Sequence, residues 1–195
     1  MIIEALGLSL IVGKLRKGKI KNLGFFRIKG SGFIFFSFII NIASILIAKQ
    51  ENFLSIFINE NFIYIRGLAY ILLLIGIGLN IEELGMKIIF AGTILNFICI
   101  IFNKGKMPVA INEMNGSYFL EQIRILKENK LLTHTFANSN TNLYYLSDII
   151  PISKPYFFPK MISIGDILIS LGIFILIQKW MINKRFNSFG KNIEI

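Results

Sequence analysis

Two aspartates lie among apolar residues in the last third of the chain, and these are the residues best suited to acid–base chemistry. Asp148 lies in Tyr144-Tyr-Leu-Ser-Asp-Ile-Ile-Pro, and Asp166 follows 18 positions later in Ile162-Ser-Ile-Gly-Asp-Ile-Leu-Ile. Two carboxyl groups brought close together would share a proton, the pKa of one would rise, and the pair could activate water. We therefore predict Asp148 and Asp166 as catalytic residues.

Each aspartate also has a structural alternative that the sequence leaves open. Ser147-Asp148 could form a turn or a cap. Asp166 stands near the start of an apolar segment, where the helix macrodipole favours a negative charge. A carboxylate at the centre of a spanning helix costs about 3 kcal/mol and less near its end, so such a residue is a functional candidate by default.

A second candidate for chemistry is the stretch Asn103-Lys-Gly-Lys-Met-Pro-Val at the end of an apolar segment. Gly105 permits a positive φ, and exposed amides beside Lys104 and Lys106 could bind an anionic head group or a phosphate. The alternative is an ordinary interfacial turn whose lysines reach the head groups. The full set of predicted ligand-binding residues is Asn103, Lys104, Gly105, Lys106, His134 and Ser163.

Cofactor and metal chemistry find no support in the sequence. The chain has one histidine, His134, and one cysteine, Cys99, which cannot build a metal site or a disulfide framework. It has no Walker, Gly-x-Ser-x-Gly or His-Glu-x-x-His motif. We predict neither a cofactor nor a metal.

The composition is that of a membrane protein. Of the 195 residues, 54% are hydrophobic and only 16% are charged, whereas soluble domains carry about 25% charged residues. The net charge is +10, and the basic residues cluster beside apolar runs. This pattern favours anionic lipids over nucleic acid as the partner. The predicted partners are membrane lipids, together with a lipid-linked substrate or another membrane protein.

The apolar segments predict an all-α, polytopic helix bundle in the cell membrane. A spanning helix needs about 20 residues, whereas strands are much shorter, so the Ile-rich runs are predicted as helices. The first segment would reach only about 20 Å, and whether it crosses the membrane stays open. Arg66 is expected to extend toward the head groups, with an internal ion pair as the alternative. The five predicted segments are about 1–13, 31–48, 62–81, 86–102 and 161–181.

Charge around these segments predicts the topology of a single membrane domain, residues 1–195. Seven basic residues and no acidic one lie between Lys14 and Lys29, which should be cytoplasmic under the positive-inside rule. The basic tail after the last segment predicts a cytoplasmic C-terminus. Residues of about 103–160 then form an extracytoplasmic cap.

Within the cap we predict an amphipathic helix over 117–130, a polar loop over 133–142 and an extended stretch between Pro151 and Pro159. Residues 49–60 are predicted as a polar connector. Gly76, Gly78, Gly165 and Gly172 are predicted to mark close contacts between helices.

Three motifs carry a resemblance that covers nearly the whole chain: Asn103 to Val109, Asp148-Ile-Ile-Pro and Ser163-Ile-Gly-Asp. They resemble a bacterial family of small multi-pass membrane proteins of unknown function, in which the position of Lys104 is more often glycine. The resemblance implies fold and location only.

The C-terminal part is also similar in layout to lipoprotein signal peptidases, which are aspartic peptidases. That similarity implies that Asp166 corresponds to one catalytic aspartate of those enzymes and that Asp148 corresponds approximately to the other. Ser163 stands where those enzymes have Asn, and their Asp-Arg pairing and N-terminal motifs are absent.

These observations lead to one function hypothesis and two alternatives. The first is a polar extracytoplasmic pocket, lined by Asn103, His134, Asp148 and Asp166, which binds or processes a lipid-linked or membrane-embedded molecule. The second is an aspartic membrane peptidase. The third is a non-enzymatic membrane assembly or partner-binding protein.

Overall fold

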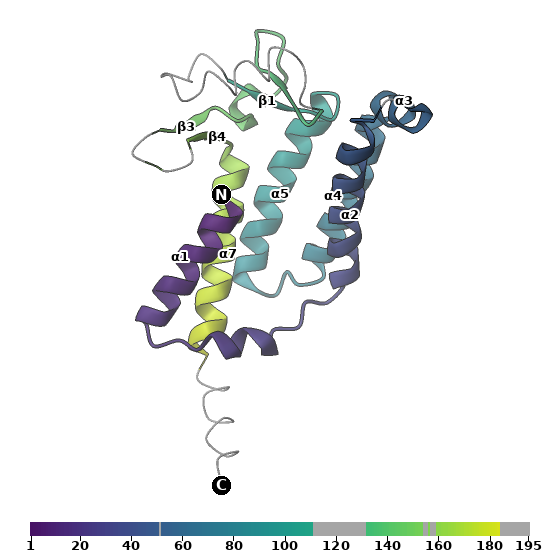
Figure 1. Cartoon of the computed structure of the whole chain (residues 1–195). Coiled ribbons are helices and arrows are strands. Elements are labelled where there is room, and N and C mark those ends of the chain that lie inside the picture. The colour runs from purple at the N-terminus through teal and green to yellow at the C-terminus, as the bar shows by residue number, and fades with distance from the viewer. Residues whose placement is uncertain (51, 111–131, 154–155, 157–158, 184–195) are drawn as a thin grey trace.

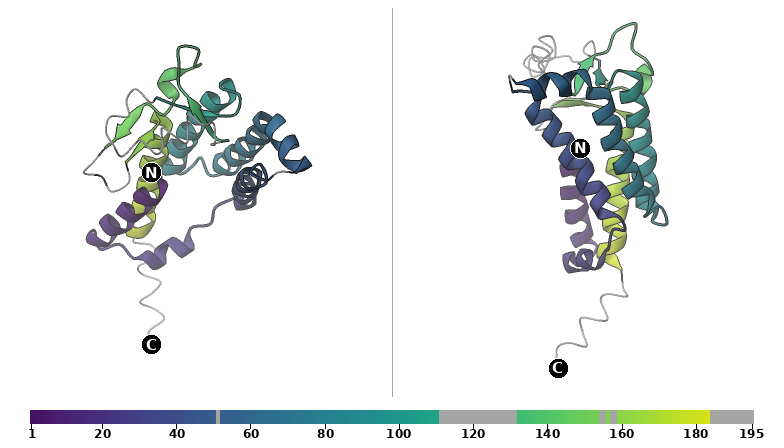
Figure 2. Two further views of the ribbon diagram at one scale, coloured as in Figure 1. Left: turned by 45° about the horizontal axis from the view of Figure 1, so that its top comes forward. Right: turned by 90° about the vertical axis from the view of Figure 1, so that its right-hand side faces the viewer.

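The structure is a computed structural model that describes residues 1–50, 52–110, 132–153, 156 and 159–183. Helices form at all five predicted apolar segments, and they stand side by side in one curved row (Figure 1). Along the row the order is α1, α7, α5, α4 and α2, which differs from their order in the chain (Figure 2). The bounds are Ile2–Leu15 for α1, Ser31–Ile47 for α2, Phe62–Gly78 for α4, Leu84–Phe102 for α5 and Ile164–Ile182 for α7.

Close packing of α5 against α7 holds the centre of this row. A Cβ atom added at Gly92 would lie 2.5 Å from the carbonyl oxygen of Gly165, and one at Gly85 would lie 2.6 Å from that of Gly172. The four glycines therefore let the two backbones touch, as small residues do between membrane helices. The predicted contacts at Gly165 and Gly172 are confirmed.

The contacts at the two other predicted glycines, Gly76 and Gly78, differ in closeness. A Cβ atom at Gly76 would lie 2.5 Å from Cγ1 of Ile34, so α2 and α4 also approach closely there. At Gly78 the nearest atom would be 3.5 Å away, on Phe90, which is an ordinary contact distance. The close contact predicted from Gly76 and Gly78 is therefore confirmed at Gly76, whereas Gly78 makes an ordinary contact.

Two helices, α5 and α7, are long and apolar enough to cross a membrane. The short helix α3 (Phe53–Glu60) and α4 pass the same test together as a bent pair with an angle of 71° between them. The 17 residues of α2 reach about 26 Å and the 14 of α1 about 21 Å, less than a hydrocarbon core of about 30 Å. The described residues thus support two or three spans, and five spans stay a prediction.

The structure is mostly helical, as predicted, but the described part of the cap also contains short strands, which corrects the all-α fold class. Strands β1 (Met107–Val109) and β2 (His134–Phe136) pair in parallel, and β3 (Ile150–Ile152) and β4 (Lys160–Ile162) pair antiparallel. A short 3₁₀ helix, η4, covers Tyr144–Leu146. Pro108 and Pro151 lie inside strands β1 and β3, where their missing N–H groups disfavour helix.

Of five further predictions, three need correction, one is confirmed and one lies outside the described residues. The predicted polar loop 133–142 contains strand β2, and the predicted connector 49–60 contains helix α3, which begins with a capping box between Asn52 and Ser55. The last helix begins at Ile164 rather than 161 because residues 160–162 belong to β4. The extended stretch after Pro151 is confirmed in β3, and the predicted amphipathic helix 117–130 lies outside the described residues.

The end of the row opposite the cap is closed by the segment after α1. The 3₁₀ helix η1 (Ile20–Phe25) runs beneath the C-terminal end of α7 (Figure 1). The side-chain amide of Asn22 and the backbone N–H of Lys19 both donate to the carbonyl oxygen of Met181, at 3.0 and 2.9 Å. These bonds satisfy a carbonyl that the end of a helix leaves open. The basic segment 14–29 consequently lies at the end of the bundle away from the cap.

Candidate functional site

Asp148 is fixed by backbone hydrogen bonds to strand β1. Its N–H donates to the carbonyl oxygen of Pro108 at 2.9 Å, and its own carbonyl accepts from the N–H of Ala110 at 3.0 Å. Its side chain is buried, with 7% of the residue exposed. The Oδ1 atom has no hydrogen-bond partner among the described residues. A buried carboxyl oxygen without a partner is costly and is a candidate for contact with a bound molecule.

His134 approaches this carboxyl from another element, and Arg66 contacts the residue that precedes His134. Nε2 of His134, in β2, lies 3.9 Å from Oδ2 of Asp148. Arg66, in the second turn of α4, donates from Nη1 to the carbonyl oxygen of Thr133 at 3.4 Å. Its guanidinium also lies over the rings of Phe62 and Tyr70, with centroid distances of 5.6 and 5.8 Å.

The prediction that the side chain of Arg66 extends to the head groups is therefore wrong. Only 7% of the residue is exposed. Two aromatic faces and a carbonyl oxygen of the cap give the guanidinium partners at the end of α4, so it turns inward. The sequence alone could not reveal this, because Thr133 lies 67 positions away.

The His134–Asp148 contact is not an ion pair at neutral pH. Burial, and next the positive charge of Arg66, lower the pKa of His134 to about 4. Burial, and next the negative charge of Asp166, raise the pKa of Asp148 to about 8. At pH 7 both side chains are uncharged, and the protonated carboxyl of Asp148 can donate a hydrogen bond.

Asp166 occupies the first turn of α7 and helps to cap that helix. The Oγ atom of Ser163 accepts from the N–H of Asp166 at 3.0 Å, and the two residues form a capping box. The structural alternative for Asp166, a favourable charge at a helix start, is therefore realised. Its negative charge is, after burial, a cause of the raised pKa of Asp148, although the two side chains form no hydrogen bond with each other.

Asn96, in α5, is a member of this site that the sequence reasoning missed. Its Nδ2 donates to Oδ1 of Asp166 at 3.0 Å, and its Oδ1 accepts from Oγ of Ser163 at 2.9 Å. A Cβ atom at Gly165 would lie 2.0 Å from Oδ1 of Asn96, so only glycine leaves room for this amide. The sequence feature that could have identified Asn96 is its polar amide side chain within an apolar segment. We call Asn96, Ser163 and Asp166, together with Arg66, His134 and Asp148, the cap-side cluster.

The motif that begins at Asn103 positions the cap. Nδ2 of Asn103 donates to the carbonyl oxygens of Cys99 and Asn142, both at 2.8 Å, and its Oδ1 accepts from the N–H of Asn142 at 3.1 Å. Lys104 and Gly105 both adopt positive φ, 57° and 80°. A Cβ atom at Gly105 would lie 2.9 Å from Cα of Ile63, so the turn packs against the start of α4.

Of the predicted set, the contacts join His134 to Asp148 and Ser163 to Asp166, and the charge of Asp166 acts on Asp148. Asn103 flanks the cap-side cluster, since Cys99 contacts both the amide of Asn103 and the hydroxyl of Ser147, with Sγ 3.5 Å from Oγ of Ser147. Anion binding by Lys104 and Lys106 stays a prediction. Among the described residues, no group of three or more His, Cys, Asp or Glu side chains could hold a metal ion.

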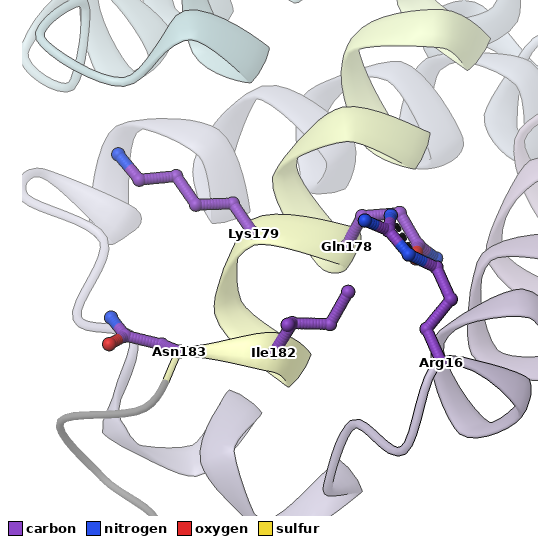
Figure 3. A pocket seen from close by; sticks show the side chains of 5 residues that line it. All are labelled: Arg16, Gln178, Lys179, Ile182 and Asn183. Atoms are coloured by element: carbon purple, nitrogen blue, oxygen red, sulfur yellow. Dashed lines mark hydrogen bonds between the residues drawn. The ribbon is translucent and has the colours of Figure 1, made fainter.

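Two pockets lie at opposite ends of α7. One of about 450 Å³ is lined by Asp166, by Glu4 and neighbouring residues of α1, and by Lys160 and Met161 of β4, so it combines charged and apolar walls. The other, of about 260 Å³, lies at the C-terminal end of α7, where Arg16 of α1 reaches Gln178 and Lys179 extends away from them (Figure 3). Its two cationic side chains do not converge, whereas the first pocket has Asp166 of the cap-side cluster in its lining.

Comparison with known proteins identifies a family but no activity. The profile of a family of unknown function, DUF5317, matches residues 25–178, and the chain belongs to this family. It is 29% identical over 108 residues to an uncharacterised protein of Thermotoga maritima, an alignment that covers 55% of this chain and 59% of that protein. The chain thus spans less than two thirds of that relative. No solved structure matches the chain.

Proposed function

We propose that this member of the DUF5317 family is an integral membrane protein that binds or processes a lipid-linked or membrane-embedded molecule at the cap-side cluster. In this proposal the cap is extracytoplasmic and the basic segment 14–29 is cytoplasmic. The polar part of the ligand enters beneath the cap, and its apolar part lies along the helices. The family match leaves the activity open, and the membrane location is supported by the two or three helices long and apolar enough to span.

The observation that carries the proposal is the buried carboxyl of Asp148, one oxygen of which has no partner among the described residues. Uncompensated polar groups of this kind are rare in folded proteins, and they concentrate at functional sites. The pocket of about 450 Å³ beside Asp166 adds a place for an amphiphile, because Glu4 and Lys160 stand there next to Ile2, Ile3 and Met161.

Mass spectrometry of amphiphiles that remain with the purified full-length chain tests this proposal. The protein is extracted in a maltoside detergent and its retained lipids are compared with those of Asp148→Asn and Asp166→Asn. We expect the wild type to retain a distinct amphiphile that both variants lose, because each substitution changes a carboxyl of the cluster.

The matched control is Glu60→Gln, which removes an exposed carboxylate at the end of α3. It should retain the amphiphile like the wild type. Equal retention by the wild type, Asp148→Asn and Asp166→Asn would refute the proposal and favour an assembly or partner-binding role.

A second candidate function, aspartic hydrolysis of a membrane-embedded peptide, is favoured by one observation. Burial, and next the negative charge of Asp166, raise the pKa of Asp148 to about 8, so Asp148 is protonated at pH 7 while it responds to the charge of a second carboxyl. In such a pair the ionised carboxylate accepts a proton from the attacking water, and the protonated carboxyl donates to the carbonyl oxygen of the substrate. Cleavage of a membrane-embedded peptide by the wild type and by neither asparagine variant would support this function. Uncleaved peptide with the wild type would exclude it for that substrate.

A further inference from the structure

Arg66 is a buried cation whose charge is poorly compensated by the described residues. Its hydrogen bond from Nη1 to the carbonyl oxygen of Thr133 is long, at 3.4 Å. Its Nε has no hydrogen-bond partner among those residues, although only 7% of Arg66 is exposed. A buried guanidinium is strongly destabilising unless an anion or several acceptors satisfy it. The unpaired Nε leaves one edge of the guanidinium able to donate.

Asp148 is the second buried group with an open hydrogen-bonding position in the same cluster. Its Oδ1 has no partner among the described residues. The raised pKa of Asp148 leaves the carboxyl protonated at pH 7, so it donates to an anion instead of repelling it. His134 connects the two residues, since its ring lies 3.9 Å from Asp148 and it directly follows Thr133, which Arg66 contacts.

His134 is much more exposed than these two groups. The side chain of His134 is 37% exposed, whereas that of Asp148 is 10% exposed. The Nδ1 atom of the ring pairs with the hydroxyl of Thr133 at 2.8 Å, which leaves Nε2 directed toward Asp148. An oxyanion that enters beside the imidazole would meet donors from α4, from β2 and from the segment of Asp148.

We propose that Arg66 and Asp148, with His134 at the entrance, bind a phosphoryl group. A guanidinium offers a rigid fork of donors that matches phosphoryl oxygens, and charge-assisted hydrogen bonds of this kind are the strong ones. The three donors come from separate elements, which suits a tetrahedral group better than a planar carboxylate. The inference rests on the proposed function and names the chemistry of the ligand, either the head group of a phospholipid-like amphiphile or free phosphate.

Binding of a fluorescent long-chain alkyl phosphate to the full-length chain in maltoside micelles tests the inference. Probes with the same chain that end in a hydroxyl or a carboxylate provide the comparison. We expect the alkyl phosphate to bind the wild type most tightly and Arg66→Gln to weaken it by about tenfold or more. Arg66→Lys, which keeps the charge and loses the fork, should give an intermediate affinity, and this second variant covers the case in which Arg66→Gln does not fold.

Arg27→Gln is the matched control, because Arg27 is exposed and lies near η1, at the end away from the cap. It should bind the alkyl phosphate like the wild type. Inorganic phosphate distinguishes the sources: displacement of the probe by it indicates a site for free phosphate, and no displacement indicates a head group.

Two results would overturn the inference: equal affinity of the wild type for the three probes, or equal affinity of the wild type and folded Arg66 variants for the alkyl phosphate. A retained amphiphile that contains no phosphorus but is lost in Asp166→Asn would also overturn it, while the proposed function would stand.

Discussion

Replacement of Asp148 by asparagine should change how stability depends on pH, and the size of the change follows from its two pKa values. The carboxyl is protonated in the folded chain up to about pH 8, whereas its ordinary value is 3.8. Between these values folding takes up a proton, so the free energy of unfolding falls as the pH rises. The fall is about 1.4 kcal/mol per pH unit. Asparagine resembles the protonated carboxyl and does not titrate, so the variant lacks this loss.

The window from pH 6.5 to pH 8 isolates this effect. His134 has a folded pKa of about 4 and an ordinary value of 6.5, so its stabilising contribution is complete above pH 6.5 and is lost as the pH falls toward 4. Across the window Asp148→Asn should gain about 2 kcal/mol relative to the wild type. For a chain of this size, the unfolding temperature of Asp148→Asn should therefore rise by roughly 4–8 °C relative to that of the wild type between pH 6.5 and pH 8.

Thermal unfolding of both proteins in detergent, followed by circular dichroism at several pH values in that window, measures the difference. The polar and charged side chains around the carboxyl are the same in both proteins, so their own contributions cancel in the comparison. Glu60→Gln, which removes an exposed carboxylate, should run parallel to the wild type. A difference between Asp148→Asn and the wild type that stays constant or shrinks from pH 6.5 to pH 8 would refute the reasoning.

Three further substitutions test the packing that holds the site. Gly92→Ala should destabilise the fold by about 1–3 kcal/mol, because the new Cβ would lie 2.5 Å from a backbone oxygen. The control Gly7→Ala should leave the stability unchanged, because the space around Gly7 is open. Equal unfolding temperatures of the two variants would contradict the close contact at Gly92. Asn96→Leu should cost about 1–3 kcal/mol because it removes both bonds to Ser163 and Asp166, and an unchanged melting curve would argue against the amide network. Asn103→Ala should make the backbone N–H of Asn142 exchange with deuterium faster because its acceptor is lost, and unaltered exchange would show that this side chain does not hold the cap.

The helices could be predicted from the sequence because membrane insertion imposes a simple constraint. Uncharged runs must bury their backbone groups in a helix, so all five apolar segments were found within a few residues of their bounds. The number of spans could not be predicted equally well. It depends on helix length to within a turn, and strand β4 takes up the residues before Ile164.

The cap and the site depend on contacts between distant residues, which a single sequence does not reveal. Arg66 turns inward because β2 and two aromatic rings meet it there, and the predicted exposure failed for that reason. Asp166 was found from its apolar surroundings, whereas Asn96, 70 positions earlier, was missed because an amide within a span gives no sign of its partner. That Asp148 and Asp166 form a catalytic pair stays a prediction.

Infrared spectroscopy of the carboxyl C=O stretch tests the central claim that Asp148 and Asp166 form one electrostatically coupled site. The full-length chain is titrated through neutral pH, and the band of Asp148 is assigned by its loss in Asp148→Asn. The account predicts a protonated carboxyl at pH 7 whose midpoint falls when Asp166 is replaced by asparagine, because a negative charge has been removed. The absence of a protonated carboxyl at pH 7, or a midpoint that Asp166→Asn leaves unchanged, would contradict it.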